Sequence, residues 1–101
     1  MRATAVVAAA ECASLDAVRA QIDRIDRSVV RLLAERATYV ARAADFKRSD
    51  AEVRAPERAA EVVRNAGRLA AEVGADARLV ERIYGAMVAA FTDYEMFARK
   101  S

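Results

Sequence analysis

Apolar residues recur along the first half of the chain at intervals that alternate between four and three residues, provided that position 36 is counted with them. This spacing is typical of a coiled-coil seam, in which one face of a helix packs against another helix. Ser14 is a suitable N-cap, and neither Gly nor Pro follows it before Arg54. The pattern therefore predicts one helix from Leu15 to about Arg48. Its apolar seam consists of Val18, Ile22, Ile25, Val29, Leu32, Tyr39, Ala43 and Phe46.

A helix of this length is longer than the rest of the chain can cover. About 34 helical residues span roughly 50 Å, at ~1.5 Å per residue. A globular domain of 101 residues has a radius of gyration of only about 13 Å. Part of the apolar seam must therefore be covered by another molecule, and a second copy of the chain is the simplest choice. The sequence predicts a homodimer.

Two shorter helices are predicted in the second half of the chain. Pro56 suits the first turn of a helix, so the second helix should begin near Ala55–Pro56, after a loop at residues 49–56. Gly74 is placed to end this helix as its C′ residue, and Asp76 to cap a third helix that reaches towards Ala98. No segment shows a strand pattern. The predicted fold class is therefore all-α, with one long and two shorter helices.

The chain length of 101 residues is enough for one domain, which we assign to residues 14–101. Residues 1–13 are interpreted as a flexible N-terminal tail, and a processed segment is the alternative. No apolar stretch approaches the ~20 residues of a membrane span, so no membrane contact is expected. Because the chain has one Cys, it cannot form an intrachain disulfide. This fits a reducing compartment, and the expected location is the cytoplasm.

Charge and composition exclude several classes of function. The 17 basic and 15 acidic residues give a net charge of +2 and form no clustered basic stripe, so a nucleic-acid partner is not expected. With no His and a single Cys, the chain cannot build a zinc site of the usual kind, and we expect no metal. A Ser–His or Cys–His catalytic pair is also impossible within the chain.

Arg36 and Lys47 are the most informative charged residues. Arg36 occupies a seam position where an apolar residue is expected, and a buried cation requires a partner. Lys47 follows eleven residues later, which on a helix leaves only about 20° of rotation between the two. Two cations on one helix face could bracket a small dicarboxylate. The alternative is an Arg36 that reaches solvent or pairs with Asp93 or Glu95, and a Lys47 that is an unrelated surface residue.

Three further charged residues are candidates for the same site. Arg19 is rotated by about −100° from Arg36 and lies roughly 25 Å along the helix, so it could join only the site of a dimer partner; otherwise it is an exposed Arg. Arg58 lies in the first turn of the second helix, where the helix dipole disfavours a cation unless an anion is near. Glu95 continues the apolar side of the third helix and needs a cation or a proton, unless it is solvated near the helix end.

Four short motifs, I-D-R-I-D, L-A-E-R, F-K and A-P-E-R, occur in this order and spacing between residues 14 and 100. In this arrangement the chain resembles the AroQ (all-α) chorismate mutase family, which includes the isochorismate-pyruvate lyases. The resemblance implies an intertwined homodimer that needs no cofactor. It also implies a small dicarboxylate substrate, chorismate or isochorismate, bound in a cationic pocket shared between subunits.

The resemblance also implies roles for individual residues. Arg36 would hold a substrate carboxylate, and Lys47 would bind a carboxylate and the ether oxygen of the breaking bond. Glu95 falls where many family members have a Gln whose amide donates to that oxygen, so the expected catalytic residues are Arg36, Lys47 and Glu95. Arg19 from the partner and Arg58 at the loop side would bind substrate. Val53, in the same loop, is counted with them.

Two positions depart from the family pattern. Glu95 can donate a hydrogen bond only when it is protonated, so we expect activity to fall as the pH rises. Ala59 stands where typical mutases have a Glu that binds the substrate hydroxyl. The absence of this Glu favours the lyase. The expected function is nevertheless chorismate mutase, the commoner activity of the family. The lyase and a non-catalytic helical dimerisation module are the alternatives.

Overall fold

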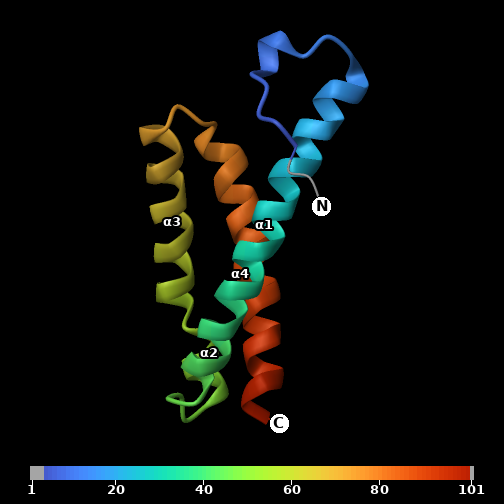
Figure 1. The fold of residues 1–101 in the computed structure, drawn as a ribbon. Coiled ribbons are helices and arrows are strands. Elements are labelled where there is room, and N and C mark those ends of the chain that lie inside the picture. The colour runs from blue at the N-terminus through green and yellow to red at the C-terminus, as the bar shows by residue number, and fades with distance from the viewer. Residues whose placement is uncertain (1–3, 101) are drawn as a thin grey trace. The chain divides into compact units, whose positions relative to one another are not determined.

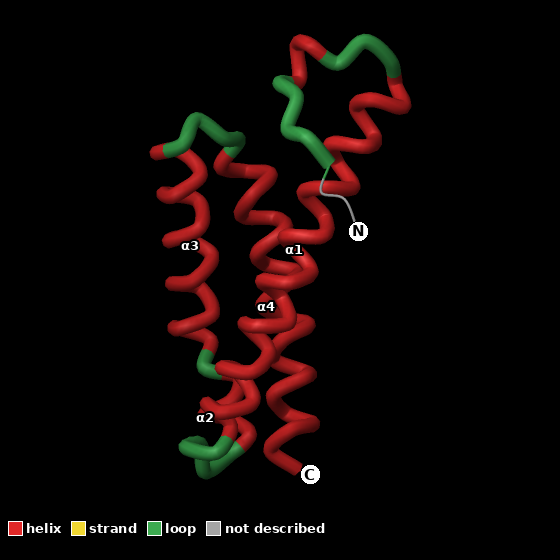
Figure 2. Tube along the Cα trace, viewed as in Figure 1, coloured by secondary structure: helices red, strands yellow, loops and turns green. Residues whose placement is uncertain are grey.

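The structure is a computed structural model that describes residues 4–100. Within this range the chain is all-α and contains no strand (Figures 1 and 2). The prediction of one long helix and two shorter ones is confirmed, and a short helix lies between them. The elements in chain order are a 3-10 turn, η1 (Ala9–Glu11), and the helices α1 (Leu15–Ala44), α2 (Asp50–Arg54), α3 (Pro56–Glu72) and α4 (Ala77–Lys100).

The chain divides within α1, after Arg36, into two compact units. In the first unit, the segment that precedes α1 is hydrogen-bonded to that helix. The side-chain amide of Gln21 donates to the carbonyl of Ala5 at 2.9 Å and accepts from the N–H of Val7 at 3.3 Å. One side chain thus binds the peptide groups of two residues in the extended segment. Residues 1–3 of the predicted tail lie outside the described residues.

The predicted helix starts are confirmed by their capping bonds. Ser14 Oγ accepts from the N–H of Ala17 at 3.0 Å. Asp76 Oδ1 accepts from the N–H of Leu79 at 3.1 Å. Each bond satisfies a peptide donor that has no partner within its own helix. Pro56, as predicted, is the first residue of α3.

The end of α1 differs from the prediction, since the helix stops at Ala44 and not near Arg48. Beyond it the chain continues in bonds of the i→i+3 type, which wind it more tightly than an α-helix. The rotation of about 20° between Arg36 and Lys47 assumed an uninterrupted α-helix and is therefore wrong. The bonds run from the N–H groups of Asp45, Phe46 and Lys47 to the carbonyls of Arg42, Ala43 and Ala44, at 3.1, 3.0 and 3.2 Å.

Helix α2 occupies most of the stretch that was expected to be a loop. Ser49 Oγ accepts from the N–H of Glu52 at 3.2 Å. The carboxylate of Glu52 in turn accepts from the N–H of Arg48 at 2.7 Å. This is a close variant of the capping box, a Ser followed three residues later by a Glu. The helix ends at Ala55, whose φ of 32° is left-handed and turns the chain directly into α3.

The second unit is built on α4, against which both α2 and α3 pack. Figure 1 shows α3 beside α4, joined to it by a short turn. The buried residues of α3 are all small: Ala66, Gly67 and Ala70. A Cβ at Gly67 would lie 2.5 Å from the carboxylate of Glu81 on α4. Small residues therefore allow the two helices to approach closely.

Gly74, the predicted C′ residue, ends α3 with a φ of 75°. Its N–H donates to the carbonyl of Ala71 at 3.2 Å, and the N–H of Ala75 donates to that of Ala70 at 2.8 Å. This pair of bonds is the Schellman motif, which requires a left-handed residue at C′.

Replacing Gly74 by alanine should lower the free energy of unfolding by about 1 kcal/mol, because a Cβ is disfavoured in the left-handed region. Gly85 is the matched control, since it lies within α4 and a Cβ there meets nothing within 4 Å. Gly85→Ala should raise the free energy of unfolding by up to about 1 kcal/mol. Urea titrations of the two variants measure both changes, and equal effects would contradict this assignment of the turn.

Candidate functional site

Lys47 and Glu95, which are far apart in sequence, form an ion pair in the second unit. The Nζ atom of Lys47 lies 2.5 Å from Oε2 of Glu95. The Glu95 side chain is 9% exposed and that of Lys47 is 26% exposed. Lys47 therefore is not an unrelated surface residue, and Glu95 is not solvated at the helix end. The two residues that the resemblance assigns to the ether oxygen of the substrate are in direct contact.

The burial of Glu95 makes this ion pair chemically significant. A buried carboxylate is strongly destabilising unless a cation or hydrogen-bond donors compensate it. In the described part of the chain, Oε2 makes no further hydrogen bond. The ammonium of Lys47 is thus the main compensation for this oxygen. An anion that binds Lys47 must compete with Glu95 for the same positive charge.

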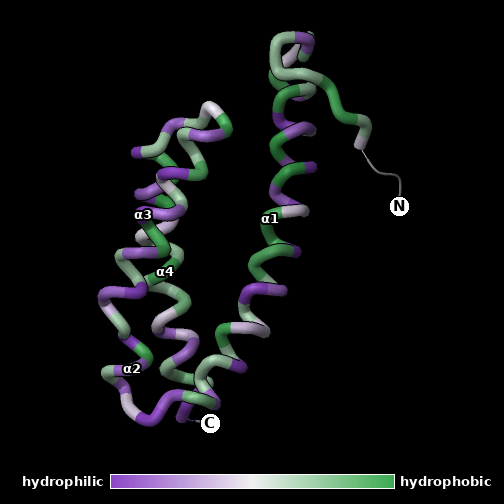
Figure 3. Tube along the Cα trace, turned by 90° about the vertical axis from the view of Figure 1, so that its left-hand side faces the viewer, coloured by the Kyte–Doolittle hydropathy of each residue, from purple (hydrophilic) through white to green (hydrophobic). Residues whose placement is uncertain are grey.

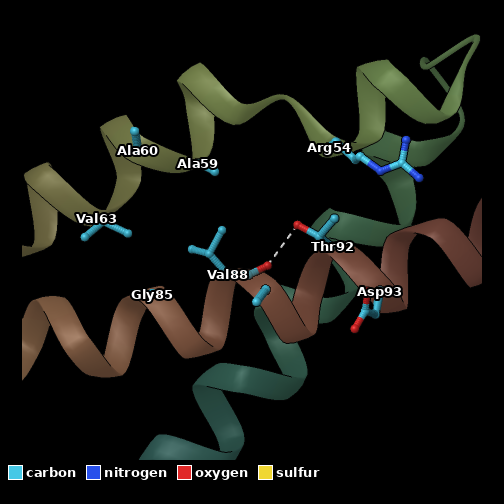
Figure 4. A pocket seen from close by; sticks show the side chains of 9 residues that line it. Arg54, Ala59, Ala60, Val63, Gly85, Val88, Thr92 and Asp93 are labelled. Atoms are coloured by element: carbon cyan, nitrogen blue, oxygen red, sulfur yellow. Dashed lines mark hydrogen bonds between the residues drawn. The ribbon is translucent and has the colours of Figure 1, made fainter.

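A pocket of about 430 Å³ lies between α3 and α4 (Figure 4). Its walls are mostly small or apolar, and Figure 4 shows Arg54 at one end. The hydroxyl of Thr92 in the wall donates to the carbonyl of Val88 at 2.9 Å. Glu95 follows Thr92 by three residues, so the two are neighbours on the surface of α4. The lining residues are Arg54, Ala59, Ala60, Val63, Gly85, Val88, Ala89, Thr92 and Asp93.

Arg54 at the end of α2 and Arg58 at the start of α3 have different environments. Arg58 is 67% exposed and forms an ion pair with Glu61 on the same helix. It is not among the residues that line the pocket, whereas Arg54 is. Arg54 was not among the predicted site residues, because residues 49–56 were expected to form a loop. The Ser-x-x-Glu capping signature would have predicted α2, of which Arg54 is the last residue.

The remaining predicted residues have different environments. Val53 on α2 is 3% exposed and belongs to the core of the second unit. Arg19 is exposed on α1, and Arg36 is half-buried on the same helix. Both arginines lie in the first unit, whereas Lys47, Arg58 and Glu95 lie in the second.

Comparison with known proteins supplies the observation that decides the family. Residues 18–96 match the family described as Chorismate mutase type II. The chain belongs to this family. It is also 40% identical over 78 residues to an isochorismate pyruvate lyase of Pseudomonas aeruginosa, and the aligned part covers 77% of each chain. The resemblance to the AroQ family is therefore confirmed, and the protein is an enzyme of this class.

The matched range of this chorismate mutase type II chain includes the predicted site. All six predicted site residues fall inside the matched range. Residues of α4 contribute to both the pocket and the Lys47–Glu95 pair, and the match includes this helix up to residue 96. Between residues 4 and 100 there is no group of side chains that could hold a metal ion. No helix in that range is long and apolar enough to cross a membrane.

Proposed function

We propose that this protein is an isochorismate-pyruvate lyase, which converts isochorismate to salicylate and pyruvate. The observation that carries the proposal is its 40% identity to a protein of that name, over 77% of both chains. Ala59 supports it, since this residue lines the pocket between α3 and α4 and leaves the pocket without the Glu that typical mutases are expected to have there.

Chorismate mutase activity is the second candidate. The family description itself favours it, and both reactions break a bond between a ring carbon and an enolpyruvyl ether oxygen. Neither reaction requires a nucleophile, a general base or a cofactor from the protein. What helps is a bound substrate conformer close to the transition state and a donor at the ether oxygen, where negative charge develops.

The charged residues have distinct roles in this proposal. Arg36, and Arg19 of a second subunit, bind the substrate carboxylates, because a guanidinium forms two parallel hydrogen bonds to a carboxylate. The ammonium of Lys47 binds the ether oxygen and stabilises its developing charge. Lys47 is released from Glu95 when substrate binds. The Lys47–Glu95 pair therefore holds the donor in place at rest and competes with the substrate.

The test is to incubate the purified protein separately with isochorismate and with chorismate and to identify the products. We expect salicylate and pyruvate to form from isochorismate faster than prephenate forms from chorismate. Arg36→Ala, which removes a carboxylate ligand, should abolish turnover and serves as the control for contaminating enzymes. If prephenate is the main product, the lyase proposal is wrong and the enzyme is a mutase. If neither substrate is turned over, both activities are excluded and the non-catalytic dimerisation module becomes the remaining hypothesis.

We also propose that the enzyme is an intertwined homodimer in which the seam of α1 is covered by a second copy. Apolar and polar residues alternate along this helix (Figure 3). The apolar residues of the seam are exposed in the single chain, Ile22 by 50% and Leu32 by 64%. Arg19 can complete a site only in such a dimer. The active enzyme should therefore have about twice the mass of the 11.0 kDa chain.

Introducing a charge into the seam is expected to dissociate the dimer. Val29→Glu places a carboxylate where a second apolar helix should pack, and a buried unpaired charge is strongly destabilising. Val30→Glu is the matched control, because Val30 is 64% exposed but is rotated by about 100° from the seam. Analytical ultracentrifugation should show a smaller species and loss of turnover for Val29→Glu alone. A monomeric wild-type enzyme that is fully active would contradict the shared site.

A further inference from the structure

The last turn of α4 is bound to the segment that carries Lys47. Arg99 Nη1 lies 2.7 Å from Oδ1 of Asp50, at the start of α2. The second terminal nitrogen of Arg99 donates to the carbonyl of Arg48 at 2.9 Å. The Arg99 side chain is 24% exposed and that of Asp50 is 41% exposed, so their ion pair is partly shielded from water, whereas the bond to Arg48 is at an exposed position. The Arg99 guanidinium thus binds the side chain of Asp50 and the carbonyl of Arg48, the two residues on either side of Ser49.

The segment at residues 45–49, between α1 and α2, has no buried residue, and three of its five residues are exposed. The N–H groups of its first three residues bond back to the last turn of α1. The backbone N–H and the carbonyl of Arg48 are both bound by side chains. The N–H donates to Glu52, and the carbonyl accepts from Arg99. Segments with few buried contacts open at a low free-energy cost. Removing the bond from Arg99 should therefore mobilise this segment.

Glu95 and Arg99 hold two adjacent residues of the segment in different ways. They are four residues apart on α4, so they lie on one face of the helix. Glu95 binds the side chain of Lys47, whereas Arg99 binds the backbone of Arg48. In the proposed reaction, the bound substrate displaces the Glu95 carboxylate from the ammonium of Lys47. The contact with Arg99 does not involve Lys47 and is retained when that exchange takes place.

We propose that Arg99 is a positioning residue that keeps the 45–49 segment, and Lys47 with it, in place when substrate displaces Glu95. This inference rests on the proposed function for its catalytic consequence, but the ordering of the segment stands on the structure alone. Without Arg99, the binding of substrate must also order the segment. The apparent KM then rises in inverse proportion to the fraction of molecules in which the segment is closed, while kcat at saturation is retained.

The experiment compares Arg99→Gln and Arg99→Lys with Lys100→Gln. Lys100 is the matched control because it lies in the same turn of α4, its side chain is 60% exposed, and its ammonium lies 3.8 Å from Asp50. For Arg99→Gln we expect faster amide hydrogen exchange at residues 45–50 and a KM increase of about tenfold if the segment is open in about nine molecules of ten. Arg99→Lys, which keeps one donor group, should restore part of the KM. Lys100→Gln should behave as wild type.

Enzyme kinetics and hydrogen exchange test the proposed function and the role of Arg99 separately. If the wild type turns over neither substrate, the proposed function fails, and hydrogen exchange alone decides whether Arg99 orders the segment. Unchanged exchange at residues 45–50 in Arg99→Gln would overturn the inference, as would a lower kcat with an unchanged KM. Asp50→Asn tests the same contact from its other side should Arg99→Gln fail to fold. It should also raise the KM and the exchange rate.

Discussion

Replacing Lys47 by methionine is expected to lower kcat/KM by a factor of about 10² to 10³, the usual loss when a donor to a developing oxyanion is removed. Methionine keeps most of the aliphatic stem but removes the ammonium that forms an ion pair with the buried Glu95 carboxylate. The loss should appear mainly in kcat, because the donor acts most strongly in the transition state. Steady-state kinetics with isochorismate and with chorismate measure it.

The stability of the variant must be separated from its activity. Lys47→Met leaves Glu95 buried without its cation, which should cost about 1–3 kcal/mol of unfolding free energy, since Lys47 is itself partly exposed. The double variant Lys47→Met, Glu95→Gln removes both charges and should recover that stability without recovering turnover. Lys100→Met is the control for loss of a surface lysine. A Lys47→Met enzyme with normal kcat would exclude Lys47 from the chemistry.

Replacing Glu95 by glutamine is expected to raise kcat/KM by about three- to tenfold, the value of one added neutral hydrogen bond. A carboxylate only accepts hydrogen bonds, whereas the glutamine amide also donates. The amide also carries no charge, so it no longer competes with the substrate for Lys47.

Steady-state kinetics of both enzymes measure this difference. Glu72→Gln is the matched control, because Glu72 is exposed at the end of α3 and should leave kcat/KM unchanged. A large loss of activity in Glu95→Gln would show that the carboxylate charge itself is required, for instance to hold Lys47 in place.

The helix termini that carry capping residues were predictable, because capping depends on a few neighbouring residues. Ser14, Asp76 and Gly74 each make the bonds that their residue types favour. Helix α2 was predictable in the same way, from Ser49 and Glu52, although the sequence analysis assigned that stretch to a loop.

The end of α1 was not predictable, because the apolar spacing continues to Phe46, two residues past the last helical residue. The segment beyond Ala44 is held instead by Glu95 and Arg99, which lie on α4. These contacts exist only when α4 has packed, and they compete with the local hydrogen bonds that would continue the helix. Periodicity contains no information about that competition.

The sequence by itself determined the three main helices and where they start, the all-α class, the absence of a His-dependent nucleophile and the resemblance to the AroQ family. These properties depend on composition and on spacing within one turn or one motif. Only the tertiary structure decided that the predicted cation Lys47 is paired with Glu95, and that Arg54 and not Arg58 lines the pocket between α3 and α4. The reason is physical: a buried charge takes the partner that packing brings within reach, and that partner is distant in the sequence.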